Sequence, residues 1–223
     1  RNYAFYTEYT LRDEYMSAQN RRSKGCYLDV QYIYGTLSNS DGENPLNYKQ
    51  FCESSSDFIG IATDALTGQP IYFGRQDMRQ DYYNVFMASS AMPYFSLPQD
   101  VNGKTCYDGS LSDPLPLEKA LAEGCEKIAL ILNMPISMCY SERDDERMAE
   151  KIASSYPKAA EALCCRAQKY RDGIAMAKEL ESKGKVTIIA PDDLCGVDTF
   201  SKDPGAMDKL YRKGDENAEI FFQ

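Results

Sequence analysis

Histidine and tryptophan are absent from this chain of 223 residues, and the lack of histidine excludes several kinds of active site. A Ser-His-Asp triad, a Cys-His dyad, a histidine-ligated zinc and a haem on a proximal histidine all require an imidazole. Acid–base catalysis near pH 7 then falls to a perturbed carboxylate, a cysteine, a lysine or a tyrosine.

Basic residues are few, with 25 lysines and arginines against 34 acidic residues and a net charge of −9. A nucleic-acid-binding protein usually carries a basic surface, so we expect no nucleic-acid partner. No apolar run approaches the roughly 20 residues of a membrane span. The opening residues 1–5 do not have the pattern of a signal peptide. We therefore expect a cytoplasmic protein, with peripheral contact at a membrane or a signal sequence in a preceding, missing segment as alternatives.

The eight cysteines form no C-x-x-C motif, so the zinc-ribbon and thioredoxin signatures are missing. We expect reduced, mostly buried thiols that behave as small apolar residues. The alternative is one reactive thiol, whose pKa would have to be lowered by a lysine, an arginine or a helix N-terminus.

The length fits one large domain or two small ones. Hydrophobic periodicity and turn signals predict these elements in order: a tyrosine-rich helix over 1–20, a hairpin over 58–73, a helix over 77–91, a turn at Asn102-Gly103, a helix from Asp113 to Gly124, a buried strand over 127–132, a helical stretch over 142–183 broken near Tyr156-Pro157, a second buried strand over 186–190 and a helix over 204–212. Asp113 suits the N-cap of its helix and Pro114 the first helical position. Strand, helix and strand in succession predict a three-layer α/β architecture.

An ordered set of short motifs begins at residue 72. It runs Tyr72-Phe73-Gly74, Asp77-Met78, Ala88-Ser89-Ser90-Ala91-Met92-Pro93, Asn102-Gly103, Tyr107-Asp108-Gly109-Ser110, Asp113-Pro114-Leu115-Pro116 and Lys127-Ile128, and continues through Arg166 and Tyr170 to about Gly214. At these spacings the set resembles the bacterial patatin-like phospholipases over nearly the whole chain. The resemblance implies one domain over residues 1–223, an α/β/α sandwich with a mostly parallel central sheet.

The resemblance also implies a Ser-Asp dyad that works without histidine, with Asp108 as the general base and Gly109 and Ser110 as its supporting turn. A serine hydroxyl is a poor nucleophile until a base takes its proton. Partial burial raises the pKa of an aspartate and makes it a better base, and a glycine beside it lets the backbone approach closely. The alternative is that Asp108-Gly109 forms a plain hairpin turn.

The nucleophile that the family places in a G-x-S-x-G elbow is missing, because that motif occurs nowhere in this chain. Ser89 and Ser90 have no flanking glycine at the elbow spacing, so we expect there a helix end packed near the site. In the family the elbow and a glycine-rich oxyanion loop precede the segment matching Arg1. We therefore expect an N-terminally incomplete domain, with an open groove where the missing central strands belong.

The implied function is that of a lipid acyl hydrolase, a phospholipase or esterase, acting on a lipid or small ester through an acyl-serine intermediate. No cofactor and no metal are implied. The alternative is a non-catalytic module that binds a lipid or a protein partner. Arg21-Arg22-Ser23-Lys24 is either a site for an anionic headgroup or phosphate, or a solvated loop. The tyrosine-rich first helix and Tyr82-Tyr83 either line an acyl pocket or belong to the core.

Overall fold

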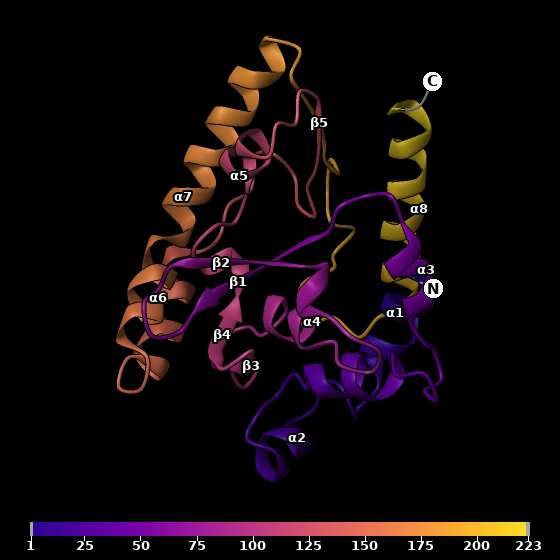
Figure 1. Ribbon diagram of the computed structural model, residues 1–223, viewed down its shortest axis with the longest axis vertical. Helices are drawn as coiled ribbons and strands as arrows, with labels where there is room; N and C mark the ends of the chain where they lie inside the picture. The colour runs from indigo at the N-terminus through magenta and orange to yellow at the C-terminus, as the bar shows by residue number, and fades with distance from the viewer. Residues whose placement is uncertain (1, 222–223) are drawn as a thin grey trace. The chain divides into compact units, whose positions relative to one another are not determined.

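The computed structural model describes residues 2–221, and its contacts divide the chain into two compact units (Figure 1). Unit 1 comprises Arg12–Asp113 and Ser141–Arg166, and unit 2 comprises Asn2–Leu11, Pro114–Tyr140 and the residues from Ala167 onward. Helix α7 (Pro157–Ser182) contributes its first ten residues to unit 1 and the remainder to unit 2. The expectation of one domain over residues 1–223 stays a prediction.

Unit 1 contains an antiparallel sheet of four strands in the order β2-β1-β4-β3. Its strands are β1 (Ile59–Asp64), β2 (Pro70–Gly74), β3 (Gln99–Val101) and β4 (Lys104–Asp108). Its helices and helical turns are α2 (Ala18–Ser23), η2 (Tyr32–Leu37), α3 (Tyr48–Glu53), η3 (Arg75–Asp77), α4 (Asn84–Ser89), η4 (Gly109–Leu111), α6 (Glu142–Ile152) and the start of α7.

Both hairpins of this sheet follow from turn chemistry. Gly68 has a φ of +69° between β1 and β2, and Asn102 and Gly103 have φ values of +54° and +78° between β3 and β4. Asparagine and glycine adopt this left-handed conformation at the least steric cost. The predicted hairpin over 58–73 and the Asn102-Gly103 turn are therefore confirmed.

Two apolar clusters hold unit 1 together. One joins the sheet to α4 and includes Phe73, Tyr83, Val85 and Cys106. The other joins the end of β4 and η4 to α6 and the start of α7. Tyr83 is fully buried in the first cluster, so its interpretation as a core residue is confirmed.

Unit 2 contains a parallel pair of strands, β5 (Ile128–Ile131) and β6 (Val186–Ile189). Its helical elements are α1 (Asn2–Thr7), η1 (Tyr9–Leu11), α5 (Leu117–Ala122), the later part of α7 and α8 (Pro204–Phe221). Leu130 and Val186 pack in one cluster with Tyr170, Ile174 and other residues of α7. Tyr3 of α1 donates a hydrogen bond of 2.7 Å to Asp208 of α8.

The expected α/β/α sandwich with a mostly parallel central sheet is wrong. Four strands form an antiparallel sheet, and the parallel strands form a separate pair. The run 127–132 predicts a strand buried on both faces, but the Ile131 side of β5 is not covered by the described residues, and Ile131 is 74% exposed. A continuous apolar run does not specify how many strands pair beside it or what covers each face.

Four helix predictions also need correction. The helix expected over 204–212 continues through Gly214 to Phe221 as α8. The tyrosine-rich helix ends at Thr7, and after a short 3-10 turn Met16 bridges to Leu28 as in a strand. The helix expected over 77–91 begins at Asn84, because Asp81 has a φ of +59°. The helix expected from Asp113 begins at Leu117, since proline at 116 disfavours helical backbone at Leu115.

Candidate active site around Asp108

Asp108 lies at the end of β4, where the strand turns into η4, and both of its backbone polar groups are hydrogen-bonded. Its N–H donates to the carbonyl of Ala91 at 3.0 Å. Its carbonyl oxygen accepts the hydroxyl of Thr63 at 2.8 Å, and Thr63 also bonds Ser112 at 2.7 Å. These hydrogen bonds join Asp108 to Thr63 of β1 and to Ala91, which lies just after α4. The backbone of Asp108 is therefore held on two sides.

The carboxylate of Asp108 is partly buried, and its Oδ1 accepts the backbone N–H of Ser110 at 2.8 Å. Burial raises the pKa of Asp108, and this effect outweighs the lowering by the Ser110 hydrogen bonds and by the charge of Arg166. An aspartate in this setting binds a proton more strongly than one in water, which is the property required of a general base.

Gly109 is required by close contact with β1. A Cβ at this position would lie 2.5 Å from the carbonyl oxygen of Ile61 and 2.7 Å from its carbonyl carbon. The alternative that Asp108-Gly109 forms a hairpin turn is wrong, because the chain enters a 3-10 turn here and the hairpin lies at Asn102-Gly103. The catalytic role of Asp108, and the supporting roles of Gly109 and Ser110, stay predictions.

Residues on both sides of Asp108 pack against two helices. Tyr107 and Leu111 belong to one buried cluster with Ala149 of α6 and Leu163 of α7. The ring of Tyr107 also meets that of Tyr156 edge to face at 5.6 Å. The turn that carries Asp108 is therefore held from the sheet on one side and from the helices on the other.

A buried ion pair connects those two helices. The guanidinium of Arg166 binds both carboxylate oxygens of Asp145, with Nε 3.1 Å from Oδ2 and a second contact from Nη2 to Oδ1. Sequence reasoning missed this pair. The available signal was that Asp145 shares the apolar face of α6 with Met148, Ala149 and Ile152, where a charged residue needs a partner.

Asp113 is not the helix cap that its sequence predicts. Its carboxylate accepts the hydroxyl of Tyr72 at 2.6 Å, and its backbone N–H donates to the carbonyl of Gly109 at 2.9 Å. Asp113 therefore closes the turn after Asp108 against β2.

Ser89 and Ser90 lie where a helix end was expected. Helix α4 ends at Ser89, and the adjoining Ala88 and Ala91 are fully buried. The Ser90 hydroxyl lies 3.2 Å from the hydroxyl of Tyr34. The predicted helix end and tight packing are confirmed.

The eight cysteines are all unpaired thiols, but the expectation that most are buried is wrong. Only Cys26 and Cys106 are buried, while Cys52, Cys125, Cys164 and Cys165 are exposed. Burial raises the pKa of Cys106, two residues before Asp108, to about 12. A thiol that holds its proton so firmly is a poor nucleophile.

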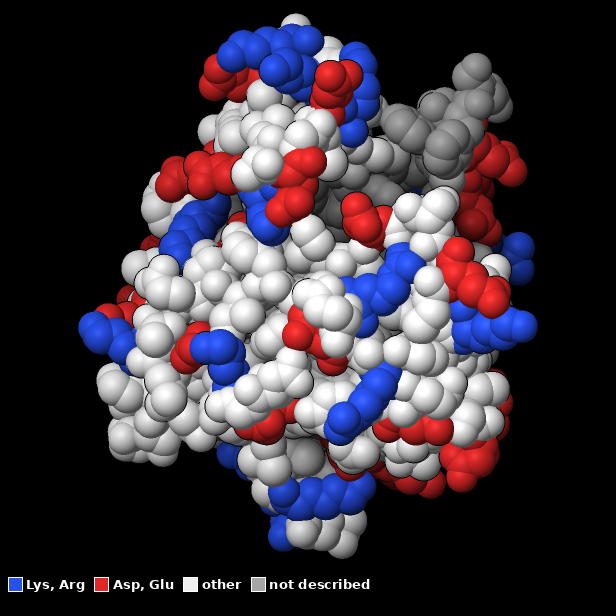
Figure 2. Space-filling view, viewed as in Figure 1, with Lys and Arg blue, Asp and Glu red and all other residues white. Residues whose placement is uncertain are grey.

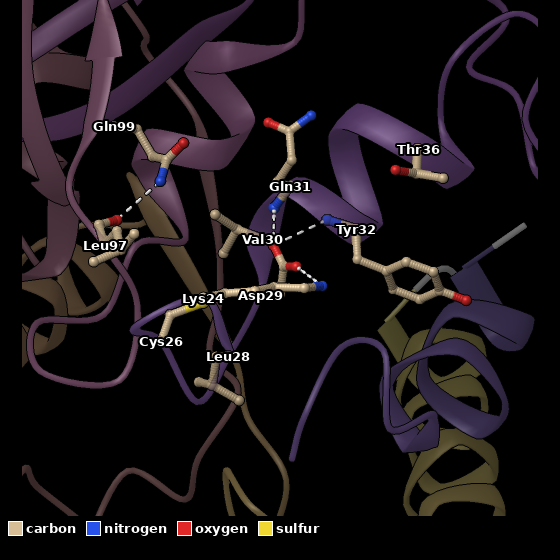
Figure 3. Close-up of a pocket in the computed structure, with 10 residues that line it drawn as sticks. All are labelled: Lys24, Cys26, Leu28, Asp29, Val30, Gln31, Tyr32, Thr36, Leu97 and Gln99. Atoms are coloured by element: carbon tan, nitrogen blue, oxygen red, sulfur yellow. Dashed lines mark hydrogen bonds and ion pairs between the residues drawn. The ribbon is translucent and has the colours of Figure 1, made fainter. Parts of the chain in front are cut away.

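A separate surface pocket of about 390 Å³ lies in unit 1 between residues 24–36 and the segment of Leu97 and Gln99 (Figure 3). Its carboxylate is Asp29, which pairs with Lys24 at 2.6 Å and accepts the N–H groups of Gln31 and Tyr32. These three partners occupy both oxygens, so Asp29 is not arranged as a base. Asp108 does not line this pocket.

Two of the three basic residues at 21–24, Arg21 and Lys24, form contacts within unit 1. Arg21 donates to the carbonyl of Tyr94 at 2.5 Å and its guanidinium lies 4.2 Å from the Tyr94 ring centre, while Lys24 pairs with Asp29. Figure 2 shows basic side chains at the lower end of the view, where α2 lies, and otherwise acidic and basic groups interspersed.

Among residues 2–221, no group of three or more cysteine, aspartate or glutamate side chains is placed to hold a metal ion. None of the helices in that same range combines the length and apolar character needed to cross a bilayer.

Comparison with known proteins gives two likenesses. Residues 156–223 match a family described as "Domain of unknown function (DUF6363)". The chain is also 22% identical over 148 residues to "Uncharacterized protein YjjU" of Escherichia coli (strain K12), in an alignment that covers 66% of this chain and 41% of that protein. The chain thus spans less than half the length of this relative.

Proposed function

We propose that this protein is a patatin-like lipid acyl hydrolase in which Asp108 is the general base. One observation carries the proposal: a partly buried carboxylate of raised pKa stands at a strand end, beside a glycine that admits no Cβ. The likeness to the Asp-Gly motif of that family, in a chain without histidine, supports the same reading. The nucleophile would be a serine outside these 223 residues.

In the proposed reaction, Asp108 takes the proton of the serine hydroxyl as the serine oxygen attacks the ester carbonyl. The tetrahedral intermediate collapses to an acyl-serine, and the leaving alcohol receives the proton from Asp108. Water then attacks the acyl-serine while Asp108 takes one of its protons. The carboxylic acid leaves, and the serine oxygen recovers its proton. None of these reaction steps needs a metal or a redox cofactor.

The test uses the intact protein and a short-chain p-nitrophenyl ester, with phospholipid vesicles as a second substrate. Asp108→Asn should lower kcat/KM by at least about 10²-fold, the low end of what a positioned base contributes. Asn keeps an oxygen to accept the Ser110 N–H, so the fold should persist. The matched control is Asp113→Asn, whose amide oxygen still accepts the Tyr72 hydroxyl.

Asp113→Asn should retain most of the activity. Equal losses in both variants would indicate a folding effect, and a fully active Asp108→Asn protein would refute the proposal. A wild-type protein that binds vesicles but hydrolyses neither substrate would instead indicate the lipid-binding module.

A further inference from the structure

The Asp145–Arg166 pair is the most deeply buried pair of opposite charges among the ion pairs of the described residues. The side chains are 1% and 7% exposed, and the contact is bidentate. Burying two charges has a large desolvation cost, and apolar residues of similar volume often stabilise a fold equally well. A purely structural contact between α6 and α7 would therefore not need these residue types.

The pair lies next to the turn that carries Asp108 in the packing of unit 1. Arg166 follows Leu163 by three positions on α7, so the two side chains share one face of the helix. Asp145 precedes Met148 and Ala149 on the same face of α6. Leu163, Met148 and Ala149 all belong to the cluster that holds Tyr107, which precedes Asp108, and Leu111, which lies three residues after it. The two helices that bear the ion pair thus clamp the turn from one side.

Arg166 also acts on Asp108 through its charge. Its positive charge lowers the pKa of Asp108, against the larger rise caused by burial. The other charged and titratable groups around the turn are engaged elsewhere: Asp64 at the end of β1 lies 3.8 Å from Lys104, Asp113 accepts from Tyr72, and Tyr107 faces Tyr156. Arg166 is the charged side chain that acts on Asp108.

We propose that Arg166 and Asp145 are positioning residues for the Asp108 base, with Arg166 supplying positive charge beside it and Asp145 partly neutralising that charge. The inference rests on the proposed function. It implies that the two members of one ion pair have opposite effects on the protonation of Asp108, which an ion pair too distant to act on the Asp108 charge would not produce.

The experiment measures kcat/KM against pH for the intact protein and three variants. Arg166→Met removes the positive charge, so the acid limb of the profile, where Asp108 takes up its proton, should move to higher pH. Asp145→Asn leaves Arg166 without its counter-charge, so the same limb should move to lower pH. Arg166→Lys keeps the charge and should leave the limb near its wild-type position. Where Arg166→Met does not fold, Asp145→Asn still decides the direction of the shift, and Arg166→Lys is the control that keeps the charge.

A second readout separates this inference from the proposed function. The ¹³C resonance of the Asp108 carboxyl carbon, assigned by its loss in Asp108→Asn, reports protonation without any substrate. Opposite shifts of its titration in Asp145→Asn and Arg166→Met would support the coupling even in a protein that hydrolyses no ester. An active wild-type protein whose variants lose activity equally at every pH, with an unmoved titration, would overturn the coupling and leave the hydrolase intact.

Discussion

Replacing Gly109 by alanine tests the geometry of the site through stability. The added Cβ would lie 2.5 Å from the carbonyl oxygen of Ile61, about 0.9 Å short of the 3.4 Å at which ordinary contact begins. The obstacle is backbone of β1, the strand paired on both sides in the sheet, so it cannot rotate away as a side chain would. Overpacking of this kind costs about 1–3 kcal/mol, and contact with backbone favours the upper value.

A loss of about 3 kcal/mol corresponds to a fall of about 6–12 °C in the thermal midpoint of a chain of roughly 150–250 residues, and to a smaller fall in a longer one. The measurement is differential scanning calorimetry of the intact protein, followed by kcat/KM on the ester substrate. The matched control is Gly103→Ala, where φ is +78° but a Cβ would meet nothing within 4 Å. Its cost is left-handed backbone strain alone, about 1 kcal/mol, with no displacement of Asp108 and no loss of activity. Equal midpoints for the two variants would refute the close approach of Gly109 to β1.

The remaining predictions concern the charge of Asp108 and the thiols. Burial raises the pKa of Asp108 above the roughly 3.9 of an unfolded chain, so between the two values the folded state binds more protons and stability falls as pH rises. Asp108→Asn removes this titration, and its thermal midpoint should therefore exceed that of the wild type at pH 7 but not at pH 3; a less stable variant at pH 7 would contradict the burial argument. Iodoacetamide should label the exposed Cys164 and Cys165 and leave ester hydrolysis unchanged, whereas a serine-directed fluorophosphonate should abolish it; the reverse pattern would indicate a cysteine nucleophile.

Local structure was predictable where a residue type has one strong backbone preference. Asn102-Gly103 formed the expected hairpin turn, and Pro157 begins α7 after the expected break in the helical stretch 142–183. Gly124 and Gly184 end their helices with φ values of +85° and +66°. Each of these features depends on a few residues that are neighbours in the chain, so each can be predicted from a single sequence.

Pairing between distant segments was not predictable in the same way. Ile128–Ile131 pairs in parallel with Val186–Ile189, as the run of elements suggests, but nothing in either segment shows that Ile131 stays exposed. The Asp145–Arg166 pair joins residues 21 positions apart whose partnership depends on how α6 and α7 pack. The Tyr72–Asp113 bond likewise depends on the sheet register, and proline at 116 overrode the capping signal of Asp113.

The two-stranded sheet of unit 2 has a consequence for handling the protein in solution. Within the described residues, β5 and β6 pair only with each other, so each strand has an edge of backbone N–H and C=O groups without a neighbouring strand, and Ile131 lies exposed on β5. Such an edge, apolar and without a lysine or proline within β5, is a template for strands of other molecules. A concentrated solution of these 223 residues is therefore prone to aggregate through β5, and a lysine in place of Ile131 would be the natural gatekeeper against it.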